Sequence, residues 1–183
     1  QLDTWERIQE LERLDAALER ALGGAFVSLA STIPFGGEAE NMATLIPGVT
    51  PDPNDLPVVS YHQVGADFFQ VMDIAVLEGR AFDVGDVAEG ELVAVVDQAF
   101  AREFFPQGDA VGSTVAYPFR GAPEMRIVGV VEAVHEGDLT GGARPTWWSP
   151  LSQMDLWQPG QLFVVAPAVF GEDATLGALA QAV

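Results

Sequence analysis

Cysteine and lysine are both absent from this chain of 183 residues, and histidine occurs only twice. Without cysteine the chain can form no disulfide, offer no thiol nucleophile and supply no thiolate metal ligand. Without lysine it lacks the phosphate-binding lysine of a P-loop, so it is not a P-loop ATPase. Long apolar runs are missing as well. Residues 127–131 form one of the longest, far short of the ~20 residues that a membrane-spanning helix requires.

Positive charge is scarce. Eight arginines stand against 27 acidic residues, which gives a formal net charge of −19. Nucleic-acid binding depends on neutralising phosphates with basic side chains, so we expect no nucleic-acid partner. The acidic surface either serves solubility or complements a basic partner.

The polar residues include no catalytic or metal-binding constellation that stands out. His62 and His135 lie far apart, without the spacing of metal ligands. Asp83 and Asp86 are close enough in sequence to share a cation, but acids are so numerous that no pair is singled out. We therefore predict no catalytic residue, no cofactor site and no metal site, and we expect that the chain is not an enzyme.

Hydrophobic periodicity indicates a mixture of helices and strands. Apolar residues at three- and four-residue intervals predict a helix over residues 4–22. The glycine in the sequence LEGR at 77–80 predicts a tight turn, since glycine tolerates unusual backbone angles. The remaining predictions are strands over 25–29, 58–64, 92–96, 113–119, 125–134, 146–148 and 162–166, helices over 66–72, 98–105 and 173–183, and a helix cap at Asp97.

Three consecutive blocks carry a more specific signal. They read VVSYHQVGADFFQVMDIAVLEGRAFDVGD (58–86), LVAVVDQAFAREFFPQGDAVGSTV (92–115) and MRIVGVVEAV (125–134). Together they resemble the extracytoplasmic core domain of MacB-type ABC transporter permeases, a group that includes the FtsX-like permeases. Looser similarity extends to STIPFGG (31–37) and TWWSPLSQ (146–153), so the resemblance covers nearly the whole chain.

The resemblance implies an α+β fold with two lobes. Residues 1–82 plus 144–183 would form an α/β lobe of the type called Porter. Residues 83–143 would form a smaller, β-rich inserted lobe of the type called Sabre.

The resemblance also implies a non-catalytic domain that relays conformational change and contacts cargo or partner proteins. It would lie on the extracytoplasmic (periplasmic) side of the membrane, anchored by transmembrane helices outside this chain. Implied partners are a second permease copy, an ABC ATPase reached through the missing transmembrane and cytoplasmic parts, and a periplasmic adaptor or lipoprotein. A free-standing periplasmic module that binds a small molecule is the alternative, and a hydrolase with an acid pair is less favoured.

Aromatic residues are the candidates for partner contact. Trp147 and Trp148 are adjacent, so in a strand they point to opposite faces, and one can fill the core while the other is exposed. Exposed tryptophan is a frequent interface anchor. Trp157 and Phe35 are further predicted contact residues.

Overall fold

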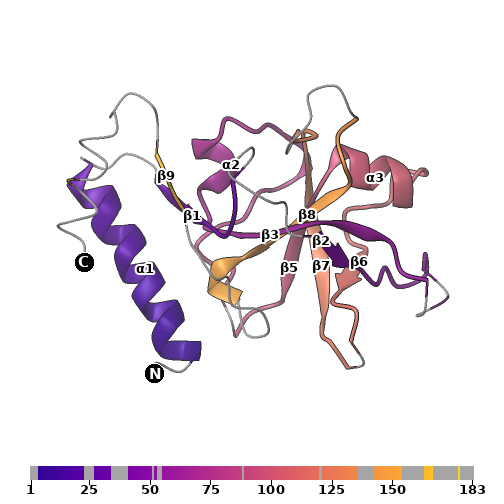
Figure 1. The fold of residues 1–183 in the computed structure, drawn as a ribbon, viewed down its shortest axis with the longest axis horizontal. Helices are drawn as coiled ribbons and strands as arrows, with labels where there is room; N and C mark the ends of the chain where they lie inside the picture. Colours follow the sequence, from indigo (N-terminus) through magenta and orange to yellow (C-terminus); the bar gives the residue numbers. More distant parts are fainter. Residues whose placement is uncertain are drawn as a thin grey trace.

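A single mixed β-sheet with helices on its faces and at one end dominates the computed structural model (Figure 1). The structure describes residues 4–22, 27–33, 41–50, 52, 55–87, 89–119, 121–135, 142–153, 163–166 and 177. In chain order the elements are α1 (Thr4–Ala21), β1 (Ser28–Ala30), β2 (Asn41–Ala43), β3 (Val58–Val64), α2 (Phe68–Val71), β4 (Val76–Gly79), β5 (Val93–Asp97), α3 (Gln98–Phe104), β6 (Thr114–Ala116), β7 (Glu124–Val131), β8 (Thr146–Pro150), the 3₁₀ turn η1 (Leu151–Gln153) and β9 (Phe163–Val165). Within these residues, no helix combines the length and the apolar character needed to cross a bilayer.

The strand order does not follow the order of the sequence. The strands run β4-β7-β5-β8-β3-β1-β9, with β2 paired to β3 and β6 paired to β7. The pairs β3–β8 and β5–β7 are parallel, and the other pairs are antiparallel. The late strand β8 thus lies in the middle of the sheet, between β5 and β3.

Most predicted elements are found near their predicted positions, and the α+β class is confirmed. The hairpin over 113–134 is present as the antiparallel pair β6–β7. Asp97 caps α3 as predicted, because its Oδ1 atom accepts a hydrogen bond of 2.7 Å from the Phe100 backbone N–H. The strand predicted over 25–29 is observed as β1 at 28–30. The final helix predicted over 173–183 lies outside the described residues, apart from Gly177, which is helical.

The predicted turn at residues 77–80 is wrong, because residues 77–79 belong to the strand β4. β4 pairs with β7, with Val76 opposite Val131 and Gly79 opposite Gly129. Gly79 does have a positive φ of 67°. A Cβ at this position would overlap the Val128 carbonyl oxygen. The glycine therefore allows two strands to approach closely, and the chain does not reverse there.

Alternating residues of the central strands pack into two hydrophobic clusters, as the two-residue period of a strand requires. One cluster contains Tyr61, Ala94, Val96 and Trp147 and includes Phe100 of α3; the other contains Val64, Val95 and Trp148 and includes Phe69 of α2. Side chains thus cover both faces of the sheet, and successive residues of one strand are both buried.

The predicted lobe boundaries do not coincide with a break in the sheet. β4 precedes residue 83 and pairs with β7 of the predicted inserted lobe. β5 of that lobe pairs with β8, which follows residue 143. The division into two lobes stays a prediction, and strands from both stretches share one hydrogen-bonded sheet.

The close approach of β4 and β7 generates a prediction for Gly129→Ala. A Cβ on Gly129 would overlap the backbone carbonyl oxygen of Arg80, and backbone atoms cannot move aside as a flexible side chain would. We expect a loss of about 2 kcal/mol in the free energy of unfolding, within the usual range for overpacking. Urea unfolding measures this loss.

The matched control is Gly142→Ala. Nothing lies within 4 Å of a Cβ placed there. We expect this variant to be at least as stable as the parent, since alanine reduces the entropy of the unfolded chain. Equal losses in the free energy of unfolding for the two variants would contradict the explanation that Gly129 allows β4 and β7 to approach closely.

Candidate functional site

Both predicted contact residues of β8 are buried, which corrects the expectation that one of them would be exposed. Trp147 is 0% exposed and Trp148 is 1% exposed. Trp148 packs edge-on against Phe69 of α2, with ring centroids 5.4 Å apart. Covered on both faces, the sheet leaves neither ring available to a partner. Trp157 and Phe35 lie outside the described residues, so their role stays a prediction.

Trp147 belongs to a buried group of polar and aromatic side chains. Its indole N–H donates to Thr44 Oγ1 at 3.0 Å, and its ring lies 4.4 Å from that of Tyr61. The Tyr61 hydroxyl is 2.7 Å from both the Tyr117 hydroxyl and Ser149 Oγ. Burial raises the pKa of Tyr61 well above its usual range and also raises the pKa of Tyr117, so both hydroxyls remain protonated. This group stabilises the core and offers no ionised nucleophile.

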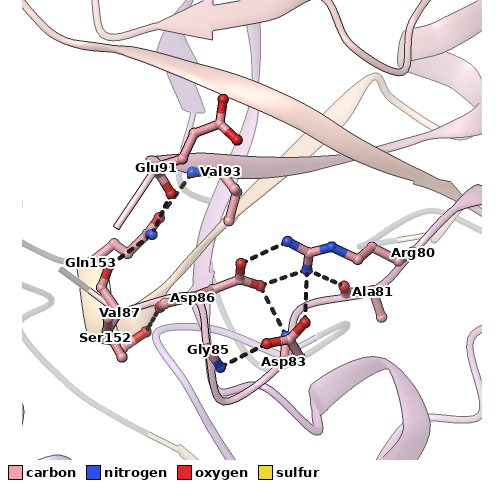
Figure 2. A network of polar contacts seen from close by, with 10 residues as sticks. All are labelled: Arg80, Ala81, Asp83, Gly85, Asp86, Val87, Glu91, Val93, Ser152 and Gln153. Carbon is pink, nitrogen blue, oxygen red and sulfur yellow. Dashed lines mark hydrogen bonds and ion pairs between the residues drawn. The ribbon is translucent and has the colours of Figure 1, made fainter. Parts of the chain in front are cut away.

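A second polar cluster connects the end of β4 to η1 at the surface, and we call it the Arg80 network. Its side chains are Arg80, Asp83, Asp86, Ser152 and Gln153 (Figure 2). Arg80 Nη1 and Nη2 donate to the two carboxylate oxygens of Asp86 at 2.7 and 2.8 Å. Such two-pronged pairing suits the planar guanidinium and is stronger than a single ion contact. The hydrogen bonds to Asp86 raise the pKa of Arg80 above its ordinary value.

Asp86 is almost fully buried, with a side chain that is 6% exposed. Besides Arg80, its carboxylate accepts a hydrogen bond of 2.9 Å from the Asp83 backbone N–H. Asp83 lies 3.4 Å from Arg80, and its Oδ1 atom accepts from the Gly85 N–H at 2.6 Å. The acid pair noted in the sequence is therefore engaged by a cation and by backbone N–H groups. Within the described part of the chain, no three acidic, histidine or cysteine side chains gather as a metal site.

The network continues into η1, directly after β8. Ser152 Oγ donates to the Asp86 carbonyl oxygen at 2.6 Å. Gln153 Nε2 donates to the carbonyl oxygens of Val87 and Glu91 at 3.1 and 2.8 Å, and its Oε1 atom accepts from the Val93 N–H at 2.9 Å. Two adjacent side chains thereby satisfy backbone groups of residues 86–93, in the second half of the connection from β4 to β5.

Neither Arg80 nor Gln153 was identified as a site residue from the sequence. Both lie in stretches that carry the family resemblance, LEGRAFDVGD and TWWSPLSQ. The two histidines lie in different environments. His62 is buried on β3 beside Trp148, with ring centroids 6.1 Å apart, whereas His135 is exposed beyond the end of β7.

The first residue of η1 contacts the N-terminal helix. Leu151 packs in a third cluster with Leu18 and Leu22, at the C-terminal end of α1, and with Leu29 of β1. Val164 of β9 packs against the same cluster. α1, β1 and β9 consequently lie together at one end of the molecule (Figure 1). η1 thus contacts α1 through Leu151 and the Arg80 network through Ser152 and Gln153.

α1 also meets the body of the domain through two carboxyl groups. Partial burial raises the pKa of Glu19, and the nearby charge of Asp67 and a hydrogen bond to it raise the pKa further. A carboxyl whose pKa is raised in the folded state favours its protonated form there. At neutral pH the contact between Glu19 and Asp67 therefore opposes the attachment of α1 that the leucines provide.

The Arg80 network generates a prediction for Arg80→Lys. Lysine keeps the charge but cannot donate two parallel hydrogen bonds to the buried Asp86 carboxylate. We expect a loss of about 1–2 kcal/mol in the free energy of unfolding, since hydrogen bonds to charged groups contribute this much and Arg80 is partly exposed. Hydrogen exchange should also become faster at the amides of residues 83–93.

Arg126→Lys is the matched control, because Arg126 and Glu91 form an exposed ion pair at 3.4 Å. Exposed pairs contribute little, so we expect a change below about 0.5 kcal/mol and no faster exchange in residues 83–93. If both variants lost the same stability, the pairing with Asp86 would have no special role.

The contact between Glu19 and Asp67 generates a prediction for Glu19→Gln. Folding raises the pKa of Glu19 above 4.5, so protonated Glu19 stabilises the folded state at low pH. This contribution to stability is lost as the pH rises through the raised pKa of the folded state. Glutamine remains neutral, so at pH 7.5 the variant should be more stable than the parent by about 0.5 kcal/mol. The difference should shrink toward pH 4.5 in urea unfolding.

Glu103→Gln, an exposed change on α3, controls for the general loss of one negative charge. We expect it to have a smaller effect than Glu19→Gln at pH 7.5. A gain in stability from Glu19→Gln that persists unchanged at pH 4.5 would contradict the explanation that the ionised Glu19 carboxylate destabilises the folded state.

Comparison with known proteins agrees with this architecture. The sequence model of the MacB-like periplasmic core domain matches residues 5–182. The macrolide export ATP-binding/permease protein MacB of Pasteurella multocida is 35% identical over 112 residues, an alignment that covers 56% of this chain and 16% of that protein. The counterpart in Aeromonas hydrophila, named MacB 2, is 39% identical over 69 residues, covering 38% of this chain and 10% of that protein. The chain thus spans only a small part of the curated relatives that it matches.

Two solved structures share the fold. The periplasmic region of MacB from Actinobacillus actinomycetemcomitans superposes with a TM-score of 0.59 at 15% identity, over 91% of this chain and 69% of that one. The extracellular domain of the noncanonic ABC-type transporter YknZ from Gram-positive bacteria gives a TM-score of 0.50 at 15% identity, over 76% of this chain and 61% of that one. Because the family's sequence model spans almost all of its residues, this chain belongs to the family of MacB-like periplasmic core domains.

Proposed function

We propose that this domain relays conformational change for an ABC-type permease and contacts cargo or partner proteins outside the cytoplasm. The match of the family model to residues 5–182 carries this proposal. In it, transmembrane helices outside this chain anchor the domain, and an ABC ATPase on the other side of the membrane drives it. A second copy of the permease would be its neighbour, and a periplasmic adaptor or a lipoprotein would be a further partner.

The way in which α1 is attached supports a mechanical role. A relay requires that movement of the helix entering the domain displaces the rest of it. Leu18 of α1 and Leu22 directly after it pack against Leu151, and the next two residues, Ser152 and Gln153, bind the connection between β4 and β5. Contiguous packing and hydrogen bonds therefore lead from α1 to the far edge of the sheet.

The two predicted lobes, residues 1–82 plus 144–183 and residues 83–143, meet at the Arg80 network. Arg80 and Gln153 belong to the first lobe, whereas Asp86 and Val93 belong to the second. We propose that this network holds the inserted lobe against the other so that both move together. The role is non-catalytic in this proposal, since the polar groups of the network are occupied by one another.

Distance measurements in the complete permease test the relay. This domain contributes no cysteine of its own, so once any cysteines elsewhere in the permease are replaced by serine, spin labels attach only at the introduced sites. We expect the distance between Glu10→Cys labels on two copies to change by on the order of 5 Å between the nucleotide-free and ATP-bound states, a displacement typical of helix shifts.

A pair of labels within one domain, Gln70→Cys on α2 with Glu103→Cys on α3, spans the two predicted lobes and is the control. This distance should stay constant, because the two sites belong to one continuously hydrogen-bonded body. Identical distances between the copies in both nucleotide states would refute the relay. A change within the single domain would refute its movement as one body.

A further inference from the structure

The strand β4 forms an exposed edge of the sheet. It pairs with β7 on one side, and in the described residues no strand pairs with its other side. All four residues of β4 are exposed, and so are the flanking Ala75 and Arg80. Backbone groups at such an edge can pair with an added strand.

Exposed apolar side chains are concentrated in β4 and in the loop that follows it. Eight large hydrophobic residues of the described chain are exposed, and four of them lie between residues 76 and 87. They are Val76, Leu77, Val84 and Val87, and Val84 is 89% exposed. We call β4 and these four residues the β4 edge. Apolar side chains gathered on a surface mark an interaction site more often than isolated ones do.

The loop that carries Val84 is held in place before any partner binds. Asp83 and Asp86, on either side of Val84, are both engaged by Arg80. The Gly85 N–H donates to Asp83 as well (Figure 2). A surface ordered in advance loses less entropy on binding, which favours affinity.

The charge around the β4 edge is negative. Residues 73–91 contain six acids and a single cation, Arg80, which Asp83 and Asp86 engage, and Arg126 of β7 pairs with a third of these acids, Glu91. Glu78 is exposed on the strand, and Asp73 is exposed shortly before it. Exposed Glu132 adjoins it, since the Glu132 N–H donates to the Ala75 carbonyl oxygen at 2.9 Å. Complementary charge on a partner must therefore be positive.

A second copy of this chain fits the β4 edge poorly. Symmetric pairing of two β4 strands would bring the same acids, including Glu78, near their own copies, and like charges opposite each other are destabilising. The ladder also shifts register between Val76 and Glu78, which leaves Leu77 at a bulge. Bulges and charges at an edge hinder pairing between identical strands.

We propose that the β4 edge is a docking site for an extended segment of another protein, with apolar side chains flanked by lysine or arginine. The partner's apolar side chains contact Leu77 and Val84, and its cations lie opposite Glu78. This site does not depend on the proposed relay, because docking requires only the isolated domain.

Two synthetic seven-residue peptides test the proposal, one alternating Lys and Val and the other alternating Glu and Val. Both are titrated into the ¹⁵N-labelled chain and followed by NMR. We expect the Lys-Val peptide to shift the amides of residues 75–87 and Glu132 selectively, and the Glu-Val peptide to bind at least about tenfold more weakly. Leu77→Gln should weaken binding of the Lys-Val peptide about fivefold, since it removes an apolar contact but no charge. Glu78→Lys should weaken binding of the Lys-Val peptide and reduce the preference between the peptides.

Val58→Gln and Glu103→Lys are matched controls on β3 and α3, where the same kinds of side chain are exposed. We expect each to change the affinity less than about twofold. Val84→Gln provides a second apolar test on the loop, in case Leu77→Gln disturbs β4.

Three results would overturn the proposal. The first is a set of shifts scattered over the acidic surface and insensitive to Leu77→Gln and Val84→Gln. The second is equal binding of the two peptides. The third is self-association of the chain in sedimentation that Leu77→Gln abolishes, which would identify a second copy as the occupant.

Discussion

The position of β8 in the middle of the sheet is the constraint on which the rest of the structure depends. β8 pairs with β3 on one side and β5 on the other, so it unites strands from both predicted lobes. Its successive residues Trp147 and Trp148 fill the clusters on the two faces. The turn η1 that follows it contacts α1 and the connection from β4 to β5. Displacing β8 would therefore disturb both faces of the core and both ends of the sheet.

The acidic character of the chain has two different structural consequences. Asp86 is an inward-facing acid, and it is tolerated because Arg80 and a backbone N–H compensate its buried charge. Asp97 is also buried, where it caps α3 and accepts from the Thr146 N–H at 3.2 Å. Exposed acids such as Glu78 instead give the surface a negative field that repels copies of the same domain and attracts cations. Among the described arginines, Arg80 compensates a buried carboxylate, whereas Arg13 and Arg126 form exposed ion pairs.

The architecture separates the surfaces that a periplasmic domain of a MacB-like permease would use. α1 is attached at the end of the sheet formed by β1 and β9, and β4 forms the opposite edge in the strand order. Movement entering at α1 and a partner bound at β4 would thus act on different edges of one sheet. The Arg80 network lies between them, because η1 reaches α1 on one side and the end of β4 on the other (Figures 1 and 2).

What could be predicted from the sequence depended on local rules. The alternation in residues 58–64, the cap at Asp97 and the hairpin over 113–134 each involve neighbours within one or two elements. The α+β class and the family resemblance followed from the order of such pieces. The acid pair Asp83 and Asp86 was visible, but its pairing with Arg80 was not, since any of several acids could have bound that cation.

Local patterns failed where a long-range contact decides the structure. Gly79 looked like a turn glycine, but the carbonyl oxygen of Val128 requires it, almost 50 residues away in the chain. Trp148 had no visible reason to be buried until α2 was placed over its face of the sheet. Gln153 binds Val93 across a separation of 60 residues. The sequence by itself determined most of the helices and strands and the family; only the tertiary structure decided which strands are neighbours and which polar groups meet, because both depend on where distant segments pack against each other.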